Sequence, residues 1–126
     1  MTGDEMPDTE QAPRPDQLSI VDTSSEGIRI LTLVGEIDYD TCETLRQALD
    51  VPAATPPPRL VIDMRRVTFM DSTGINLFIS AHQSATDAGG WIRLAAPTSP
   101  VMRTIQIVGL NALIDCHATL REALSP

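Results

Sequence analysis

The sequence predicts a single α/β domain built around a small mixed β-sheet. Two apolar runs, over residues 18–23 and 28–34, flank the polar stretch "TSSEG", a pattern typical of an antiparallel hairpin. After this hairpin, helical and strand patterns alternate along the chain, an order that produces parallel strands joined by helices. The 126 residues are 42% hydrophobic, which suits one domain with its own core.

The first helix is predicted over residues 40–51. Asp40 is its expected N-cap, and Glu43, three residues later, would complete an acidic variant of the capping box. The proline-rich stretch 52–58 should end this helix and form a loop, because proline lacks a backbone donor and has a fixed φ.

The middle of the chain is predicted to hold a buried strand and a long helix. Residues 59–64 form a nearly continuous apolar run, which is typical of a strand in the centre of a sheet. Residues 65–69 are expected to form a turn-like connection. From Ser72 the pattern is helical, and Gly89 and Gly90 favour its end.

The next two elements are a strand over residues 91–97 and a helix over residues 98–110. Ser99 is the expected cap of this helix, and Pro100 would occupy its first position, where a missing N–H costs nothing. Gly109 should end the helix.

The chain is expected to close with a short strand within residues 112–117 and a helix over residues 119–126. Thr119 and Glu122 have the spacing of a capping box at the start of that helix. The complete predicted order is therefore ββαβαβαβα, within a domain that spans residues 17–126.

Residues 1–16 are expected to precede the domain as a disordered acidic tail. They contain five acidic residues, one arginine and three prolines, with no apolar periodicity. They also lack the basic and apolar regions of a secretory signal peptide. No apolar run in the chain approaches the roughly 18 residues that a transmembrane helix needs, so we expect a cytoplasmic protein with no membrane partner.

The net charge of −8 argues against nucleic-acid binding, which favours a basic face. The two cysteines, Cys42 and Cys116, are far apart in the sequence and belong to no CxxC motif. We therefore expect neither a metal site nor a cofactor. The favoured interpretation is two small apolar side chains in a reducing compartment, and a redox link between them is the alternative.

The stretch "FMDSTG" at residues 69–74 is the candidate functional motif. A serine hydrolase is not favoured, because the G-x-S-x-G elbow is absent and the only histidines are His82 and His117. His82 is ten residues further along the same predicted helix, about 15 Å from Ser72. An aspartic protease is excluded by the extra residue between Asp71 and Gly74 and by the lack of a second copy. We expect no enzyme.

A phosphorylation switch at Ser72 fits the physical chemistry better. The start of a helix offers unpaired N–H groups and the positive end of the helix dipole, so a phosphate can be held there without unfolding the domain. The plainer alternative is that "DSTG" only caps the helix, since Asp, Ser and Thr are all common caps. The residues alone leave both interpretations open.

Two separated stretches, "GEIDYDTCETLRQAL" (35–49) and "LVIDMRRVTFMDSTGINLF" (60–78), resemble the STAS domain family, and more closely its bacterial anti-sigma factor antagonists. The similarity continues through residues 88–110 and 120–124, so it covers nearly everything except the tail. The resemblance implies a single STAS-type domain, in which a small mixed sheet carries about four helices, packed mainly on one face.

The resemblance also implies a function. In the antagonists, the serine of the D-S-x-G motif is phosphorylated by a partner anti-sigma factor with serine kinase activity. The unphosphorylated antagonist binds that partner and frees a sigma factor. The phosphorylated antagonist dissociates, until a phosphatase removes the phosphate and restores the binding form. Ser72 occupies the phosphorylated position here, and Asp38 matches an acid near it. The alternative is a non-switching STAS scaffold subunit of a stressosome-like or transporter-linked complex.

The predicted partner-binding surface begins at Ser72 and follows one side of its helix. The helical period places Ser72, Asn76, Ile79 and Gln83 on this side, and Gly74, Phe78, Ala81, Ala85 and Ala88 on the core side. Ile79 is either an anchor for the partner or partly buried with Ile75. The loop "EIDYDT" is expected beside the helix start, by analogy with the family. The predicted binding residues are Asp38, Tyr39, Thr41, Asp71, Ser72, Thr73, Gly74, Asn76 and Ile79.

Three further expectations concern individual side chains. Asp38 and Asp71 are expected to orient the Ser72 hydroxyl toward the kinase, which supplies its own ATP and Mg²⁺. Thr73, one position further into the helix, should be less exposed than Ser72. Phe69 and Met70 are expected to anchor the loop before the helix.

Overall fold

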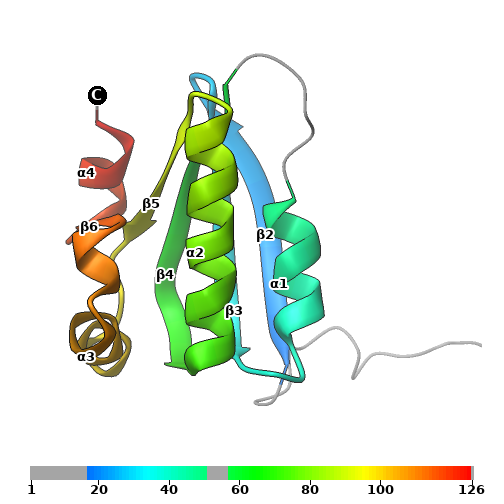
Figure 1. The fold of residues 1–126 in the computed structure, drawn as a ribbon, viewed down its shortest axis with the longest axis vertical. Coiled ribbons are helices and arrows are strands. Elements are labelled where there is room, and N and C mark those ends of the chain that lie inside the picture. The colour runs from blue at the N-terminus through cyan, green and yellow to red at the C-terminus, as the bar shows by residue number, and fades with distance from the viewer. Residues whose placement is uncertain (1–16, 51–56, 126) are drawn as a thin grey trace, which may run out of the picture.

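The structure is a computed structural model that describes residues 17–50 and 57–125 (Figure 1). The predicted acidic tail and most of the predicted proline-rich loop lie outside the described residues. The elements are β2 (Leu18–Ser25), β3 (Ile28–Ile37), α1 (Cys42–Leu49), β4 (Arg59–Met70), α2 (Ser72–Asp87), β5 (Trp91–Ala95), α3 (Ser99–Val108), a 3₁₀ turn η2 (Leu110–Ala112), β6 (Asp115–His117) and α4 (Leu120–Leu124). Apart from this short turn, the order of elements confirms the prediction.

The five described strands form one sheet in the order β2-β3-β4-β5-β6. The pair β2–β3 is antiparallel, as a hairpin requires, and each later strand lies parallel to the one before it. The sheet is therefore mixed, as predicted. Because β3 and β4 are parallel neighbours, the loops that follow them lie at the same edge of the sheet.

Three of the four described helices cover one face of the sheet, which confirms the prediction for the fold. In Figure 1, α1 and α2 lie in front of the strands, and α3 lies beside the lower part of the sheet. The main core lies between these helices and the sheet. Its fully buried members include Leu31, Leu33, Leu45, Ile62, Phe78, Leu94 and Ile105.

The fourth helix, α4, packs on the opposite face and forms a smaller cluster. Ala123 of α4 is buried there against Ile28, Val61 and Ala95. Val61 lies between two main-core residues of β4 in sequence, so the alternation of a strand turns its side chain to the other face.

The prediction that residues 65–69 form a turn was wrong, because β4 continues to Met70. Two shifts in the β3–β4 register each leave one extra residue on β4. As a result, Met64, Val67 and Met70 are all buried in the main core at a spacing of three rather than two. Because the apolar residues recur every three positions here, the alternation of period two that predicts a strand is absent from this part of the sequence.

The structure corrects two predicted caps by one residue. The N-cap of α1 is Thr41 rather than Asp40, and Glu43 forms an ion pair with Arg46 instead of closing a capping box. The N-cap of α3 is Thr98 rather than Ser99.

Two other predicted helix signals are confirmed. Gly109 ends α3 in the left-handed conformation with φ of 78°, which glycine adopts without strain. At α4, the Thr119 hydroxyl accepts from the Glu122 N–H at 3.1 Å, and the Glu122 carboxylate accepts from the Ala118 N–H at 3.2 Å.

Candidate functional site

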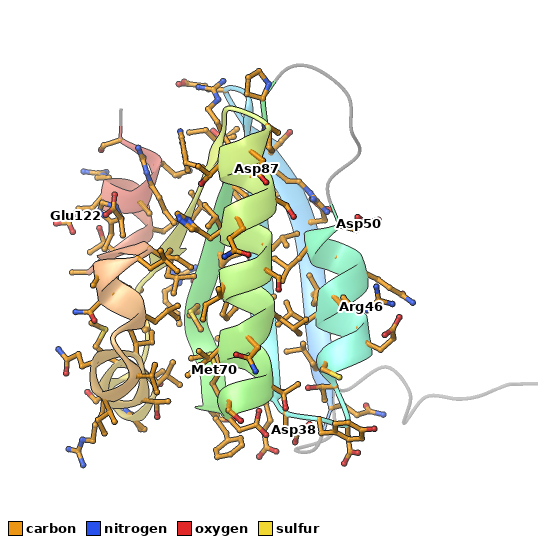
Figure 2. All side chains as sticks on the ribbon, in the orientation of Figure 1. Asp38, Arg46, Asp50, Met70, Asp87 and Glu122 are labelled. Carbon is orange, nitrogen blue, oxygen red and sulfur yellow. The ribbon has the colours of Figure 1, made fainter. Side chains whose placement is uncertain are left out.

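The candidate site is formed where β3 and β4 end. Ile37 and Met70 are the last register pair of these strands, and the Asp71 N–H extends the pairing by donating to the Ile37 carbonyl at 3.1 Å. Figure 2 shows Asp38 at the same end of the sheet as Met70. The structure thus places the residues after β3 beside the start of α2, and we call Asp38–Thr41 and Asp71–Gly74 together the strand-end site.

The loop after β3 is held by Thr41, which is only 6% exposed. Its hydroxyl donates to the Glu36 carbonyl at 2.9 Å and accepts from the Asp38 N–H at 3.0 Å. The Asp38 carboxylate accepts in return from the Thr41 N–H at 3.1 Å. This reciprocal arrangement folds the loop back on itself and leaves Tyr39 at its tip, 78% exposed.

The start of α2 is capped by Asp71 rather than by Ser72. Asp71 has an extended backbone, and its carboxylate accepts from the Thr73 N–H at 2.9 Å. Ser72 is the first helical residue and is exposed, whereas Thr73 is half-buried, as predicted. The helix cap and the candidate phosphorylation site are therefore different residues.

The prediction that Asp38 and Asp71 orient the Ser72 hydroxyl does not match the hydrogen bonds. Both carboxylates accept from backbone N–H groups of their own turns. Among the described residues, no hydrogen bond joins Ser72 to either acid, so its hydroxyl faces solvent without a protein partner.

Gly74 allows α2 to begin directly against the end of β3. A Cβ atom built on Gly74 would lie 2.5 Å from Ile37 Cγ2 and 2.9 Å from Met70 Cγ. Both of these side chains are buried in the main core. Gly74 therefore leaves the room that close packing at the helix start requires.

The predicted partner-binding residues separate into an exposed group and a buried group. Tyr39, Ser72 and Asn76 are exposed, and Asp38, Asp71, Thr73 and Ile79 are half-buried. Thr41 and Gly74 are buried, so they position the site without presenting a side chain to a partner. Ile79 packs against the main core, which favours the more conservative of its two interpretations.

The core stripe of α2 is correct for Gly74, Phe78, Ala81 and Ala85, all of which are buried. Ala88 was assigned wrongly to this stripe, because the helix ends at Asp87 and Ala88 is exposed.

Sequence reasoning missed Phe69 as an exposed residue of this end of the molecule. Met70 is buried at 4% exposure, as expected of an anchor, but Phe69 is 48% exposed. Phe69 pairs in register with Glu36, immediately after the second bulge of β4. The bulge turns Phe69 away from the main core. Phe69 directly precedes the buried Met70, but this position predicts an exposed side chain only if β4 is known to continue to Met70.

Acidic side chains dominate the strand-end site. Asp38 and Asp71 are half-buried and Asp40 is exposed, while no arginine lies within residues 38–41 or 71–74. Glu36, just before the site, is also half-buried. A phosphate on Ser72 would therefore join an existing group of negative charges.

The Cys42 thiol donates to the Tyr39 carbonyl of this site at 2.9 Å. No cluster of three or more His, Cys, Asp or Glu side chains suited to a metal occurs within the described ranges. Cys42 and Cys116 are both free. Burial, followed by the nearby Asp115 carboxylate, raises the pKa of the Cys116 thiol, which keeps it protonated at neutral pH.

The helices of the described ranges include none with the length and apolar character required to cross a bilayer.

Comparison with known proteins identifies the family of this chain. The model of the STAS domain matches residues 19–123. The anti-sigma-F factor antagonist RsfB of Mycobacterium tuberculosis is 28% identical over 88% of this chain and 90% of its own length. The anti-sigma-B factor antagonist of Bacillus subtilis is 33% identical over 70% of this chain and 80% of its own.

A solved structure agrees with these relatives. The crystal structure of an anti-sigma factor antagonist from Mycobacterium paratuberculosis has a TM-score of 0.78 and 29% identity to this chain, and the match covers 90% of this chain and 96% of that one. Residues 19–123, which the STAS model matches, include both halves of the strand-end site.

Proposed function

We propose, from the premise that this chain belongs to the STAS domain family, that it is an anti-sigma factor antagonist switched by phosphorylation of Ser72. Unphosphorylated, it binds an anti-sigma factor with serine kinase activity, and a sigma factor is released. After phosphorylation it dissociates, until a phosphatase acting on phospho-Ser72 restores it. The observation that carries this proposal is that Ser72 is exposed at the first residue of a 16-residue helix, and that its hydroxyl has no hydrogen-bond partner among the described residues.

The local structure can accept a phosphate without losing the fold. The Ser72 hydroxyl makes no side-chain hydrogen bond among the described residues, so its modification breaks none. Asp71 already caps the helix through Thr73, and the dipole of α2 stabilises negative charge at its start.

The same phosphate would change what this surface can bind. It adds about −1.5 to −2 charges next to Asp71 and at the same edge of the sheet as Asp38. A partner surface complementary to an exposed Tyr39 and to a neutral Ser72 would have to accommodate that charge. Binding would therefore be lost because the phosphate must be desolvated in the interface, where it also repels the nearby Asp71 and Asp38 carboxylates. No change of fold is needed.

The proposed contact surface consists of Asp38, Tyr39, Asp71, Ser72, Thr73, Asn76 and the exposed edge of Ile79. Thr41 and Gly74 hold the two turns in position. The protein itself is proposed to be a cytoplasmic binding protein rather than an enzyme. It needs no cofactor, because the kinase supplies ATP and Mg²⁺, and it has no nucleic-acid or membrane partner.

Phosphorylation can be tested directly. The full chain is incubated with candidate anti-sigma factor kinases and ATP, and the phosphorylated residue is located by mass spectrometry. We expect one phosphate on Ser72, absent in Ser72→Ala and retained in Thr73→Ala. Phosphate that moves to Thr73, or that persists in Ser72→Ala, would contradict the assignment.

Binding tests the charge mechanism separately. By calorimetry with the same anti-sigma factor, Ser72→Ala should bind like the natural chain, and Ser72→Asp should bind roughly tenfold or more weakly, about 1.4 kcal/mol. Ser80→Asp, an equally charged change at an exposed position two turns further along α2, is the matched control and should bind normally. Equal affinities for Ser72→Ala and Ser72→Asp would count against repulsion.

Absence of phosphorylation by every candidate kinase would favour the second hypothesis, a non-switching scaffold subunit of a stressosome-like or transporter-linked complex.

A further inference from the structure

The face of the sheet opposite the main core is covered unevenly. On that side, α4 packs near β4, β5 and β6. Toward β2 the side chains alternate, so that Leu18 and Ile20 join the main core while Ser19 and Val21 face the other way. Val21 is 55% exposed. The half of this face formed by β2, β3 and the end of β4 is thus open among the described residues.

A groove of about 500 Å³ crosses this open half. It is lined by Val21, Thr32, Val34, Asp63, Arg65 and Arg66, and we call it the back groove. Two rows of paired residues cross the strands β2, β3 and β4 in this groove. Val21 pairs with Thr32, which pairs with Asp63. Ser19 pairs with Val34, which pairs with Arg66.

The charge of the back groove is opposite to that of the chain. Asp63 is 1% exposed and holds Arg65 in an ion pair at 2.8 Å. Arg66 is exposed and forms no ion pair with any described residue. One net positive charge, on Arg66, therefore remains in the groove of a protein whose net charge is −8.

We propose that the acidic segment 1–16 of this chain docks across the back groove, with its carboxylates on Arg66 and Arg65. This inference goes beyond the proposed function and does not depend on it. The segment contains Asp4, Glu5, Asp8, Glu10 and Asp16 against a single arginine. Its charge complements the groove, whereas a symmetric pairing of two copies through this groove would place Arg66 near another Arg66.

The connection between the segment and the groove makes this contact accessible. Residue 17 leads directly into β2, whose Ser19 is two strands from Arg66, about 10 Å across the sheet. Sixteen residues can extend over roughly 50 Å, so the acids from Asp4 to Glu10 can reach the groove. Tethering raises the effective concentration of these acids near Arg66, so that weak individual contacts can still populate a docked state.

Paramagnetic relaxation enhancement tests the contact in the full chain. A nitroxide is attached at Thr9→Cys in a Cys42→Ser, Cys116→Ser background, and amide signals are compared between groove residues and exposed positions of α2 and α3. We expect broadening at Val21, Thr32, Val34 and Arg66. It should fall by at least half in about 0.5 M salt, because surface ion pairs are then screened within a few ångströms.

Matched variants identify the basis of the contact. Arg66→Gln should reduce the broadening at the groove by at least half. Arg103→Gln removes from α3 an exposed arginine that forms no ion pair with any described residue, and this change should leave the broadening at the groove unchanged. Equal broadening on both faces, or none, would overturn the proposal. Broadening that appears only between labelled and unlabelled molecules in a mixed sample would assign the groove to a second copy, which also overturns it.

A second measurement avoids the cysteine replacements. In the chain with its natural cysteines, the tail acids are neutralised together by Asp4→Asn, Glu5→Gln, Asp8→Asn and Glu10→Gln. The amide shifts of Val21, Thr32 and Val34 should then change, and those of α2 should not. Unchanged groove shifts would refute docking even if the spin-labelled chain fails to fold.

Discussion

Individual residues at the strand-end site show how narrowly its geometry is determined. Gly74 lets α2 start against Ile37 and Met70, and Thr41 holds the loop after β3 through three backbone groups. Ser72 lies between these fixed points yet is itself exposed. The residue that we propose is phosphorylated thus lies between two closely packed turns, which would suit a site that must be presented in one position.

The first prediction concerns Gly74→Ala. Alanine favours a helix over glycine by about 1 kcal/mol, but overpacking a core typically costs about 1–3 kcal/mol. The added Cβ would meet buried side chains at 2.5 and 2.9 Å, not flexible ends. We therefore expect a net loss of up to about 2 kcal/mol in the free energy of unfolding, measured by urea denaturation. Ser80→Ala, on the exposed side of α2, should stay within about 0.5 kcal/mol. A stabilised Gly74→Ala protein would show that the contact can relax.

Single residues were predictable where their role is local. The glycine at the close approach, the glycine that ends α3 and the Thr119 cap follow from preferences of one residue or one turn. The caps Thr41 and Thr98 were each missed by one position, because neighbouring Asp, Ser and Thr residues have similar capping preferences. The backbone that leads into the helix decides between them.

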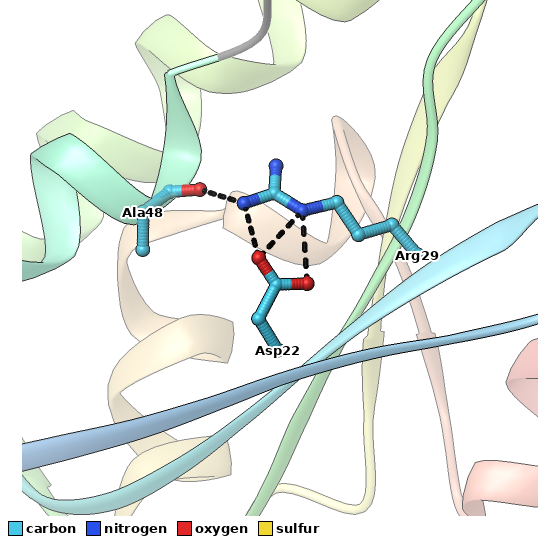
Figure 3. Close-up of polar contacts among 3 residues, drawn as sticks. All are labelled: Asp22, Arg29 and Ala48. Carbon is cyan, nitrogen blue, oxygen red and sulfur yellow. Dashed lines mark hydrogen bonds and ion pairs between the residues drawn. The ribbon is translucent and has the colours of Figure 1, made fainter.

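Among the elements, the β2–β3 hairpin is also linked to α1 by a polar contact. The Arg29 guanidinium donates to the Asp22 carboxylate across the hairpin and to the Ala48 carbonyl near the end of α1, each through Nη2 at 2.8 Å (Figure 3). Hydrogen bonding from Arg29, more than its charge, lowers the pKa of Asp22 against some opposing desolvation. One side chain therefore connects the sheet edge to a helix.

The sign of this pKa shift gives a pH-dependent prediction. A carboxyl group whose folded pKa is lowered stabilises the protein at neutral pH, and the contribution is lost as the pH falls through the folded value, below 3.8. Asp22→Asn should lower the free energy of unfolding at pH 7 by about 0.2–1 kcal/mol, since the pair is largely exposed. The difference from the natural chain should shrink in acid.

The control removes a charge from the same hairpin without breaking an ion pair. Glu26→Gln in the turn should change stability less than Asp22→Asn at pH 7, with both followed by urea denaturation across the pH range. A difference for Asp22→Asn that grows in acid would contradict the assignment of a lowered pKa.

At the scale of the whole molecule, the sheet separates two cores of unequal size. The main core lies under α1, α2 and α3, and the smaller one lies under α4. Ile62 is completely buried in the main core, while Ile28 is 8% exposed in the smaller one. The two isoleucines allow the same methylene to be removed from each core.

We expect Ile62→Val to be the more destabilising change. Loss of this methylene costs about 0.5–1.5 kcal/mol depending on how well the site can collapse. Ile62 is enclosed between the sheet and three helices, so the cost of Ile62→Val should be near the upper limit of this range. Ile28 lies next to a hairpin turn, so the cost of Ile28→Val should be near the lower limit. Chemical denaturation of both variants measures the difference. Equal costs would show that α4 encloses its core as tightly as the other helices do.

The sequence by itself determined the order of the elements, the start of α2 at Ser72, the mixed sheet and the family resemblance. The comparisons confirm the family. These features depend on the period of apolar side chains and on residues a few positions apart, so the local sequence is enough to predict them. The role of Ser72 as a switch remains a proposal, although its position at a helix start was predicted correctly.

Only the tertiary structure decided how far β4 extends, that Phe69 is exposed, that Asp38 and Asp71 bond to backbone groups, and that a basic groove lies behind β2 and β3. Each of these depends on the register between strands that are distant in sequence. The two extra residues on β4 change its side-chain period from two to three. No local pattern reveals such a shift, because the partner strand β3 supplies the hydrogen bonds that accommodate it.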